Sequence, residues 1–475
     1  MKVKYLSSVL SNISFWRGLG ILMSGIFTMV FVVVFIPNYA KIFALYILPG
    51  AILGVILIPI FCRFPEIFFT LFLTAGCFKG DPRLESILPK FFDLTVFFGA
   101  IVVLSILYKT LKKKLKIPRI SNKLFFPYII LVILMFVGLF YTEAPIYGLD
   151  KFLRFITITT LAIFGPLFLF TDIKKFHRFL YILVAISSLM VMESIISYFG
   201  MSGGFRTAFG SNYLALGRIT GISALMIIYY FLVKSGKKYK FLWTIVLLLN
   251  LFGLLFGGGK APVISFLIAL VAIGTLSFGL RIPKAKYHLL KISLFFLFCI
   301  ILVFIFSPDI FGVLFARLTQ LVAAPQESAS LIVRLNLFKS ALRALYDYPI
   351  LGTGVGGYSF YAFKIDTRAY PHNIFLEVAS ELGIIGLFLL IFLIGFCFFY
   401  LLSLRKKYKE KEKYFLITMV LALFVFMFLN SCASGDINDN RLFFVWIGSA
   451  YALNNIFKFE NLKGIAPQSK ENATK

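Results

Sequence analysis

The feature that most constrains this chain is the repetition of apolar runs, each near 20 residues long, along almost its whole length. A helix of about 20 apolar residues crosses the hydrocarbon of a bilayer. Of the 475 residues, 60% are hydrophobic and only 14% are charged, whereas about a quarter of the residues of a soluble domain are charged. The sequence therefore predicts an all-α polytopic membrane protein.

About fourteen transmembrane helices are expected, or twelve if two early segments do not cross. Their centres fall near residues 27, 51, 72, 99, 132, 162, 187, 225, 248, 270, 299, 391, 422 and 449. The third expected span is short and is the weakest. We expect four regions: an N-terminal membrane region of about eleven spans (1–307), a large external loop (308–371), a C-terminal membrane region of three spans (372–457) and a cytoplasmic tail (458–475).

The formal net charge of +28 does not indicate a nucleic-acid partner, because the basic residues lie in short clusters between apolar runs. Most of the 48 Lys and Arg residues fall in alternate loops, and the positive-inside rule then places both termini in the cytoplasm. The five cysteines are scattered without a CxxC pair, which argues against a disulfide framework or a zinc site. The first apolar run lacks a cleavage motif and is interpreted as an uncleaved span.

The middle of the external loop is predicted to form an amphipathic helix. Its apolar positions at helical spacing are Leu335, Phe338, Leu342 and Leu345, and Asn336, Lys339 and Arg343 lie on the opposite face. Arg334 lies at the edge of the apolar stripe. We therefore expect Arg334 to point back toward the membrane domain.

His372 is the only histidine expected on the external side, since His177 and His288 lie in basic cytoplasmic loops where solvent exposure is expected. It follows Pro371, a residue favoured in the first turn of a helix. The helix dipole there disfavours an imidazolium. A neutral imidazole can accept a proton from a hydroxyl, which is worth about 10²–10⁴-fold in rate. The alternative is that His372 only caps the helix or reaches the interface.

Three further basic residues lie at the external ends of spans. Arg206 and Arg218 flank the start of the eighth span, and Lys260 follows three glycines at the outer end of the tenth. Charges this close to hydrocarbon often serve an anion or a transport pathway. Lys260 next to free backbone N–H groups would suit a phosphate. Each of them could instead simply extend to the membrane interface.

The acidic residues give weaker indications. Asp81, Glu85, Asp436 and Asp439 are expected on the external side, but they are far apart in sequence, so a metal site is not favoured. Glu377 and Glu381 lie one turn apart below His372. Either could orient the imidazole or simply favour the positive end of the helix.

The run R-x-x-x-F…YPILGTGVGGYSFY…PHNIFLEVASELGIIG resembles the signature region of the O-antigen ligase and polymerase superfamily. In that family an Arg-bearing helix, a P-x-x-G-x-G segment and an HN followed by a G-x-x-G helix occur in this order. The segment LFGGGKAPVISFL also resembles the family's earlier motif, in which a basic residue, usually Arg, opens a membrane helix. Here that residue is Lys260, which lacks the planar fork of a guanidinium.

The resemblance implies a GT-C-type helical bundle that transfers a glycan from an undecaprenyl-diphosphate carrier to an acceptor hydroxyl. It implies an inverting enzyme without a metal or other cofactor, on the external face of the bacterial inner membrane. His372 would be the base or the group that orients the acceptor, Arg334 would hold the diphosphate, and Lys260 would be a second diphosphate ligand. Arg218 and Arg206 are added as substrate-binding candidates only because they are expected at the external ends of spans; the family motif does not include them.

Within the family, the acceptor separates a ligase acting on lipid A–core from a polymerase acting on a growing glycan and from protein O-glycosyltransferases. A ligase is slightly favoured. The alternative from another class is a flippase or transporter of lipid-linked oligosaccharides. A transporter more often has two matching halves and ionisable residues at mid-membrane. Here the ionisable residues gather at the outer rim beside one long loop, which favours an enzyme.

Overall fold

The computed structural model describes residues 63–87, 92–112, 120–198, 207–233, 240–278 and 329–465, with a few isolated positions between them. This part of the chain is helical and contains no strand. The helices before the long loop are α3 (Pro65–Thr74), α4 (Pro82–Ile87), α5 (Leu94–Leu111), α6 (Asn122–Gly138), α7 (Pro145–Arg154), α8 (Thr160–Leu169), α9 (Ile173–Tyr198), α10 (Tyr213–Val233), α11 (Lys240–Phe256) and α12 (Lys260–Phe278). After them come α15 (Ala329–Asp347), α16 (Gly357–Phe363), α17 (Ile374–Lys407), α18 (Lys411–Ser431) and α19 (Arg441–Ile465).

The expected all-α fold is confirmed for the described residues, but the expected number of about fourteen spans is not. Among the described residues, six helical segments are long and apolar enough to cross a membrane, and further apolar helices are shorter. Every expected span within the described residues coincides with a helix. The expected spans near 27 and 51 lie outside those residues, and so does most of the one near 299. The third expected span is short, as anticipated, and ends in a 3₁₀ turn at Cys77.

Helix α19 forms the centre of the bundle, where it packs against α8 and α18. Phe444, Val445 and Trp446 are fully buried. Gly448 allows the close approach to α8, because a Cβ at this position would lie 1.9 Å from the carbonyl oxygen of Ile163.

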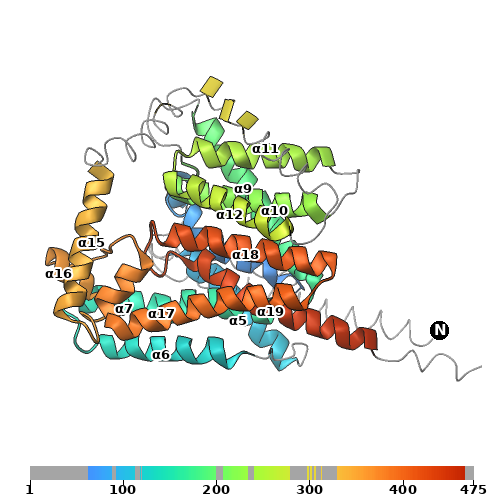
Figure 1. Ribbon diagram of the computed structural model, residues 1–475. Helices are drawn as coiled ribbons and strands as arrows, with labels where there is room; N and C mark the ends of the chain where they lie inside the picture. Colours follow the sequence, from blue (N-terminus) through green and yellow to red (C-terminus); the bar gives the residue numbers. More distant parts are fainter. Residues whose placement is uncertain are drawn as a thin grey trace, which may run out of the picture.

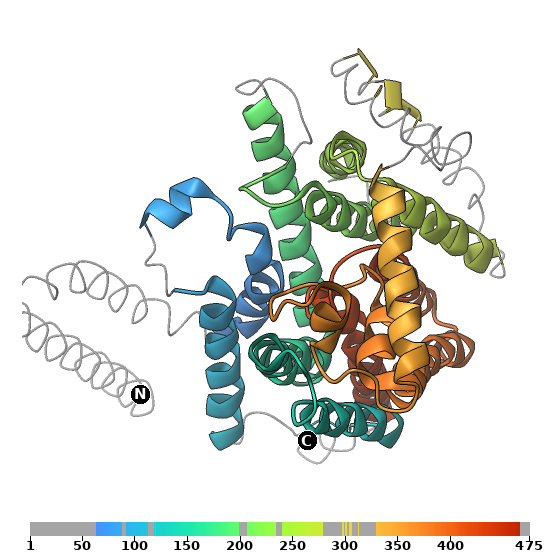
Figure 2. The same ribbon diagram turned by 90° about the vertical axis from the view of Figure 1, so that its left-hand side faces the viewer.

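Figure 1 shows α6, α17, α18 and α19 running side by side, with α15 standing across their ends on the left next to α16. Figure 2 views the molecule from this end, where α15 crosses in front of the bundle. The last residues of α19 lie at the opposite end (Figure 1). The helix predicted in the long loop is therefore present, and it lies across the ends of the spans.

The apolar face predicted for α15 is partly wrong. Leu335 and Leu342 are exposed, whereas Ala341 and Ala344 are buried where α15 packs on α17. The small alanine side chains allow this close packing, which the larger leucines would prevent. Arg334 is partly buried, on the side of α15 that faces the bundle, as expected.

The glycine-rich segment after α15 docks into a break in α17. Gly383 has φ 64° and ψ −162°, which interrupts the helix and frees its backbone groups. The freed groups are satisfied by the segment: the Ile384 N–H donates to the Pro349 carbonyl at 2.8 Å, and the Gly354 N–H donates to the Glu381 carbonyl at 2.9 Å. A Cβ at Gly352 would lie 2.3 Å from the carbonyl carbon of Glu381. The glycines of the segment and Gly383 of α17 thus allow the two backbones to come into contact.

Candidate functional site

The site lies where the chain enters α17, at the end of the bundle crossed by α15. Asn373 caps the helix, since its side-chain oxygen accepts from the N–H groups of Phe375 at 2.9 Å and Leu376 at 3.1 Å. Its amide nitrogen donates to the carbonyl of Cys432 at 3.0 Å, which fixes the turn to the end of α18. The expectation that Pro371 and His372 form the first helical turn is wrong, because the helix begins after the Asn373 cap.

His372 has a left-handed backbone conformation with φ 58°. This conformation is unfavourable for a residue with a Cβ and is maintained by its surroundings. The imidazole is partly buried, with the Tyr370 ring edge-on at a centroid distance of 4.7 Å. Its Nδ1 is buried and has no hydrogen-bond partner among the described residues. The turn thus places one unpaired ring nitrogen inside the site.

Burial, and then the positive charges of Arg334, Arg218 and Arg368, lower the pKa of His372 below its usual value. The imidazole is therefore neutral at neutral pH and can accept a proton. The same three guanidinium groups produce a positive potential around the ring. A site of this kind attracts an anion and a hydroxyl-bearing partner together.

Arg334 and Arg218 reach the site from two different helices. Arg334, in α15, has no hydrogen bond or ion pair to another described residue; its electrostatic neighbours include Arg218 and His372. Arg218, in α10, donates to the carbonyl of Ser434 at 3.0 Å, and its buried Nε has no hydrogen-bond partner among the described residues. Two guanidinium groups with unused donors in one place are suited to a phosphate.

Fewer contacts define the position of Lys260 relative to His372. It is the first residue of α12 and follows Gly258, which has φ 68°. This start of α12 packs on α10 next to Arg218, since a Cβ at Gly217 would lie 2.9 Å from the Pro262 side chain. Within the described residues, Lys260 is not among the charges that act on His372. Arg206 lies outside the described residues.

A charged cluster next to His372 was missed in the sequence interpretation. Arg368 donates from Nε to Asp436 at 3.0 Å and pairs with Asp439. Arg154, at the end of α7, lies 3.7 Å from Asp436 and 3.5 Å from Asp439. Burial and the neighbouring Asp436 raise the pKa of Asp439 above its usual value. From the sequence, Asp436 and Asp439 were expected only as external carboxylates. The signal that could have linked them to Arg368 is that all three were expected at the external ends of the spans.

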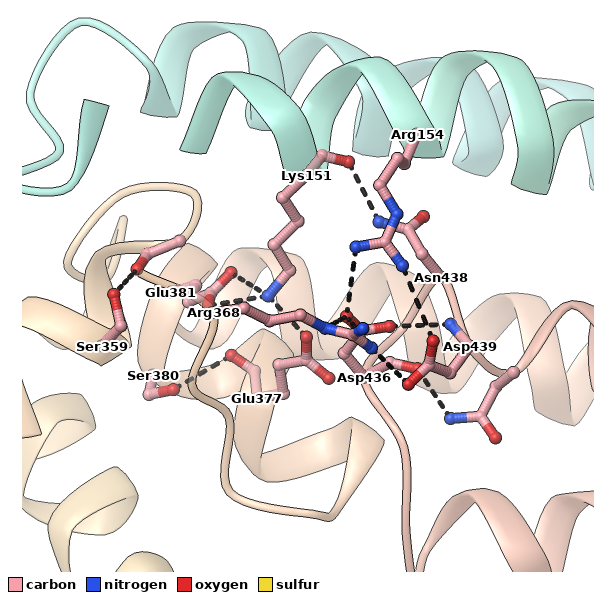
Figure 3. A network of polar contacts seen from close by, with 12 residues as sticks. Lys151, Arg154, Ser359, Arg368, Glu377, Ser380, Glu381, Asp436, Asn438 and Asp439 are labelled. Atoms are coloured by element: carbon pink, nitrogen blue, oxygen red, sulfur yellow. Dashed lines mark hydrogen bonds and ion pairs between the residues drawn. The ribbon is translucent and has the colours of Figure 1, made fainter. Parts of the chain in front are cut away.

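A second missed residue is Lys151 of α7, whose buried side chain extends toward Glu377 and Glu381 (Figure 3). Its Nζ lies 2.7 Å from Oε1 of Glu381 and pairs with Glu377 as well. Of the two alternatives for these glutamates, the one in which they orient the imidazole is therefore not supported, because both pair with Lys151. Asn438 donates to the Lys151 carbonyl at 3.0 Å, which links this cluster to the one around Asp436. Glu377 lies in the first turn of α17, after the Asn373 cap, and Arg368 acts on His372, so both clusters adjoin the site.

Of the remaining candidates, Asp81 and His177 lie within the described residues. Asp81 binds Arg83 at 2.7 Å, and among the described residues no three His, Cys, Asp or Glu side chains are grouped so as to hold a metal ion. His177 was expected to be solvated in a loop, but it lies in α9 and lines a pocket with Tyr181 and Trp243. Its ring stacks on the ring of Tyr181, with the two ring centroids 6.2 Å apart. His288 lies outside the described residues.

Residues 244–391 match a family model described as O-antigen ligase. The resemblance to the O-antigen ligase and polymerase superfamily is confirmed. The O-antigen ligase match covers less than a third of the chain, from α11 into α17, and includes Lys260, Arg334 and His372. Arg218 and Asp436 lie outside it. No curated protein matches the chain. Together with the apolar helices, the match indicates an integral membrane protein related to the O-antigen ligases and polymerases.

Proposed function

We propose that this chain is a membrane glycosyltransferase that moves a glycan from an undecaprenyl-diphosphate carrier to an acceptor hydroxyl. The observation that carries the proposal is the neutral His372 among the guanidinium groups of Arg334, Arg218 and Arg368. The O-antigen ligase match over residues 244–391 supports the class of reaction. The acceptor is proposed to be lipid A–core, as in a ligase.

In the proposed reaction, His372 removes the proton of the acceptor hydroxyl as its oxygen attacks the anomeric carbon of the donor sugar. The bond from that carbon to the diphosphate oxygen breaks, and the diphosphate leaves with the electron pair. One displacement of this kind inverts the anomeric centre. The developing negative charge is stabilised by Arg334 and Arg218, whose donors are fixed before the reaction begins.

Lys260 and Arg206 are proposed to extend the same anion site. Lys260 opens α12 beside Arg218, where an ammonium and helix N–H groups could face a phosphate. As a lysine it provides a point charge rather than a bidentate fork. Arg206 joins the proposal on its position in the sequence alone. The chemistry as proposed needs no metal, because the cations on the side chains neutralise the leaving group.

The site is proposed to face the periplasm from the inner membrane, with both termini in the cytoplasm. The end of the bundle opposite α15 carries Arg405, Lys406 and Lys407 at the end of α17, and Lys411 and Lys413 follow in α18. The positive-inside rule assigns such a cluster to the cytoplasm. The external loop at 308–371 would then place Arg334 next to the carrier in the outer leaflet.

The test is the glycan profile of a deletion strain that carries the wild-type chain, His372→Ala or Arg334→Ala. We expect both variants to lose at least about 10²-fold of the transfer while inserting into the membrane normally. Matched controls are His177→Ala, for a histidine outside the site, and Asn336→Ala, on the exposed side of α15. Normal glycan attachment in either site variant would remove the assigned role.

The same strain distinguishes the acceptor. Free long chains that are not attached to lipid A–core indicate a ligase, whereas single attached repeat units indicate a polymerase. A strain with neither defect would contradict both. Accumulation of the donor on the cytoplasmic side would instead support a transporter.

A further inference from the structure

Helix α15 carries an apolar stripe that no described part of the protein covers. Leu335, Leu342 and Tyr346 are 47%, 54% and 84% exposed. At about 100° per residue they fall on one side of the helix, away from Ala341 and Ala344, which pack on α17. Three large apolar side chains on one side of a helix indicate a contact that is made outside the described part of the chain.

The stripe continues into the segment that follows α15, where Tyr348, Ile350 and Leu351 are exposed. The Tyr141 hydroxyl donates to the Leu351 carbonyl at 2.7 Å, and the Pro349 carbonyl binds the N–H of Ile384 in α17. This segment is therefore attached to the turn after α6 and to the break in α17 at Gly383. Exposed apolar side chains lie next to it on both helices and in the turn after α6: Phe136, Phe140, Ile384 and Phe388.

The stripe of α15 and the outer faces of α6 and α17 thus form one connected apolar surface. The faces of α6 and α17 belong to apolar helices of a membrane protein and would meet acyl chains. Because α15 stands across the ends of these helices (Figure 1), it lies along the plane where the hydrocarbon ends. A surface that continues from spans to a crosswise helix fits a bilayer boundary better than a protein partner.

Two cations border the stripe on the solvent side. Lys339 and Arg343 are exposed and form no ion pair with any described residue. Their helical positions place them next to Tyr346, which is itself a residue favoured at membrane interfaces. An apolar stripe flanked by Lys and Arg is the arrangement of a helix that lies in the interface of an anionic bilayer.

We propose that α15 lies on the bilayer surface at this end of the protein, with Leu335, Leu342 and Tyr346 in the boundary between acyl chains and headgroups. Lys339 and Arg343 then contact lipid phosphates. The opposite side of the helix carries Arg334, whose charge acts on His372. Lipid contact on one side of α15 therefore holds a cation of the candidate site in place on the other.

The proposal is tested with nitroxide labels on the full chain in lipid nanodiscs, in a background whose native cysteines are replaced and whose unfolding transition is retained. Leu342→Cys and Tyr346→Cys report on the stripe, and Asn336→Cys, on the exposed side of the same helix about 100° from Leu335, is the matched control. We expect the labels at 342 and 346 to be more accessible to oxygen than to a water-soluble nickel complex. The label at 336 should show the reverse.

Lipid charge provides the second arm. In phosphatidylglycerol discs the label at 342 should lie deeper than in phosphatidylcholine discs, and Lys339→Glu with Arg343→Glu should remove the difference. Equal nickel access at 342 and 336 in both lipids would overturn the proposal. Dipolar broadening between labels that grows with protein per disc would also overturn it, in favour of a second copy of the chain. Neither readout depends on glycan transfer, so the result is independent of the proposed reaction.

Discussion

Two groups of charges lie next to each other at one end of the bundle, and they are built in opposite ways. Around Lys151, one ammonium is fully buried against two glutamates, and each group has a partner of opposite charge. Around His372, Arg368 is paired with Asp436 and Asp439, but the other two cations form no ion pair with a described residue. Arg334 has none, and Arg218 retains a buried Nε without a hydrogen-bond partner among those residues. In the first group the ammonium lies between two carboxylates, although the oxygens of Glu377 have no hydrogen-bond partner among the described residues. The second group has cationic donors left for a ligand.

The difference separates scaffold from site. A buried ion pair contributes little net stability, but loss of one partner leaves a charge in a medium that cannot solvate it. A cluster of like charges is unfavourable on its own and becomes favourable when an anion binds. The Lys151 group is therefore expected to govern folding, and the His372 group to govern turnover. Substitutions in each group test whether stability and turnover are separated in this way.

The largest effect is expected for Lys151→Met. It leaves Glu377 and Glu381 buried without a cation, and removal of one member of a buried pair costs about 3–5 kcal/mol of unfolding free energy. The measurement is unfolding of the purified chain in detergent. Lys151→Met combined with Glu377→Gln and Glu381→Gln should recover most of the loss, since no charge is then left unpaired. A single variant as stable as the wild type would show that the ammonium is not needed.

Next in size is Arg218→Gln, which tests the other side of the comparison. A hydrogen bond to a charged group is worth about 1.5–3 kcal/mol, so kcat/KM for transfer should fall about 10- to 100-fold. The unfolding free energy should change by less than about 1 kcal/mol. Arg218→Lys retains the positive charge but not the bidentate guanidinium, so its kcat/KM should lie between those of the wild type and Arg218→Gln. Large destabilisation with unchanged kcat/KM would make Arg218 part of the scaffold instead.

The positions of the helices were largely predictable, because the spacing of apolar residues along the sequence indicates which helix faces are buried. The apolar runs located every described span, and the position of Arg334 on α15 followed from its angle on a helical wheel. What could not be predicted was how charges pair across long sequence distances. Lys151 and Glu381 lie 230 residues apart, and the sequence contains no cue that joins them.

The errors near the site have local physical causes. The start of α17 was misplaced because a Pro–His pair resembles a first turn, while Asn373, two residues on, is the stronger cap. The stripe of α15 was assigned to the protein interior because hydrophobicity cannot distinguish a lipid contact from a protein contact. The small Ala341 and Ala344 made the closer packing instead.

A smaller effect is expected in the pH profile. Because the charge of Arg334 lowers the pKa of His372, Arg334→Gln should raise that pKa toward its usual value. The neutral base is lost as pH falls through the pKa, so the acid limb of kcat/KM should move to higher pH in the residual activity of the variant. Lys339→Gln, on the exposed side of the same helix, should leave the limb in place. An unmoved limb in Arg334→Gln would show that His372 does not set it.

The smallest effect concerns the backbone of His372. The left-handed conformation costs a residue with a Cβ about 1–2 kcal/mol, whereas glycine adopts it freely. Glycine also gains freedom in the unfolded chain, which offsets about 0.4–1 kcal/mol of that benefit. His372→Gly should therefore exceed His372→Ala in unfolding free energy by about 0.5–1 kcal/mol, although neither retains the imidazole and both should be inactive. If the alanine variant proved the more stable, the turn would not be left-handed in the folded protein, and the orientation of the imidazole that defines the site would have to be redrawn.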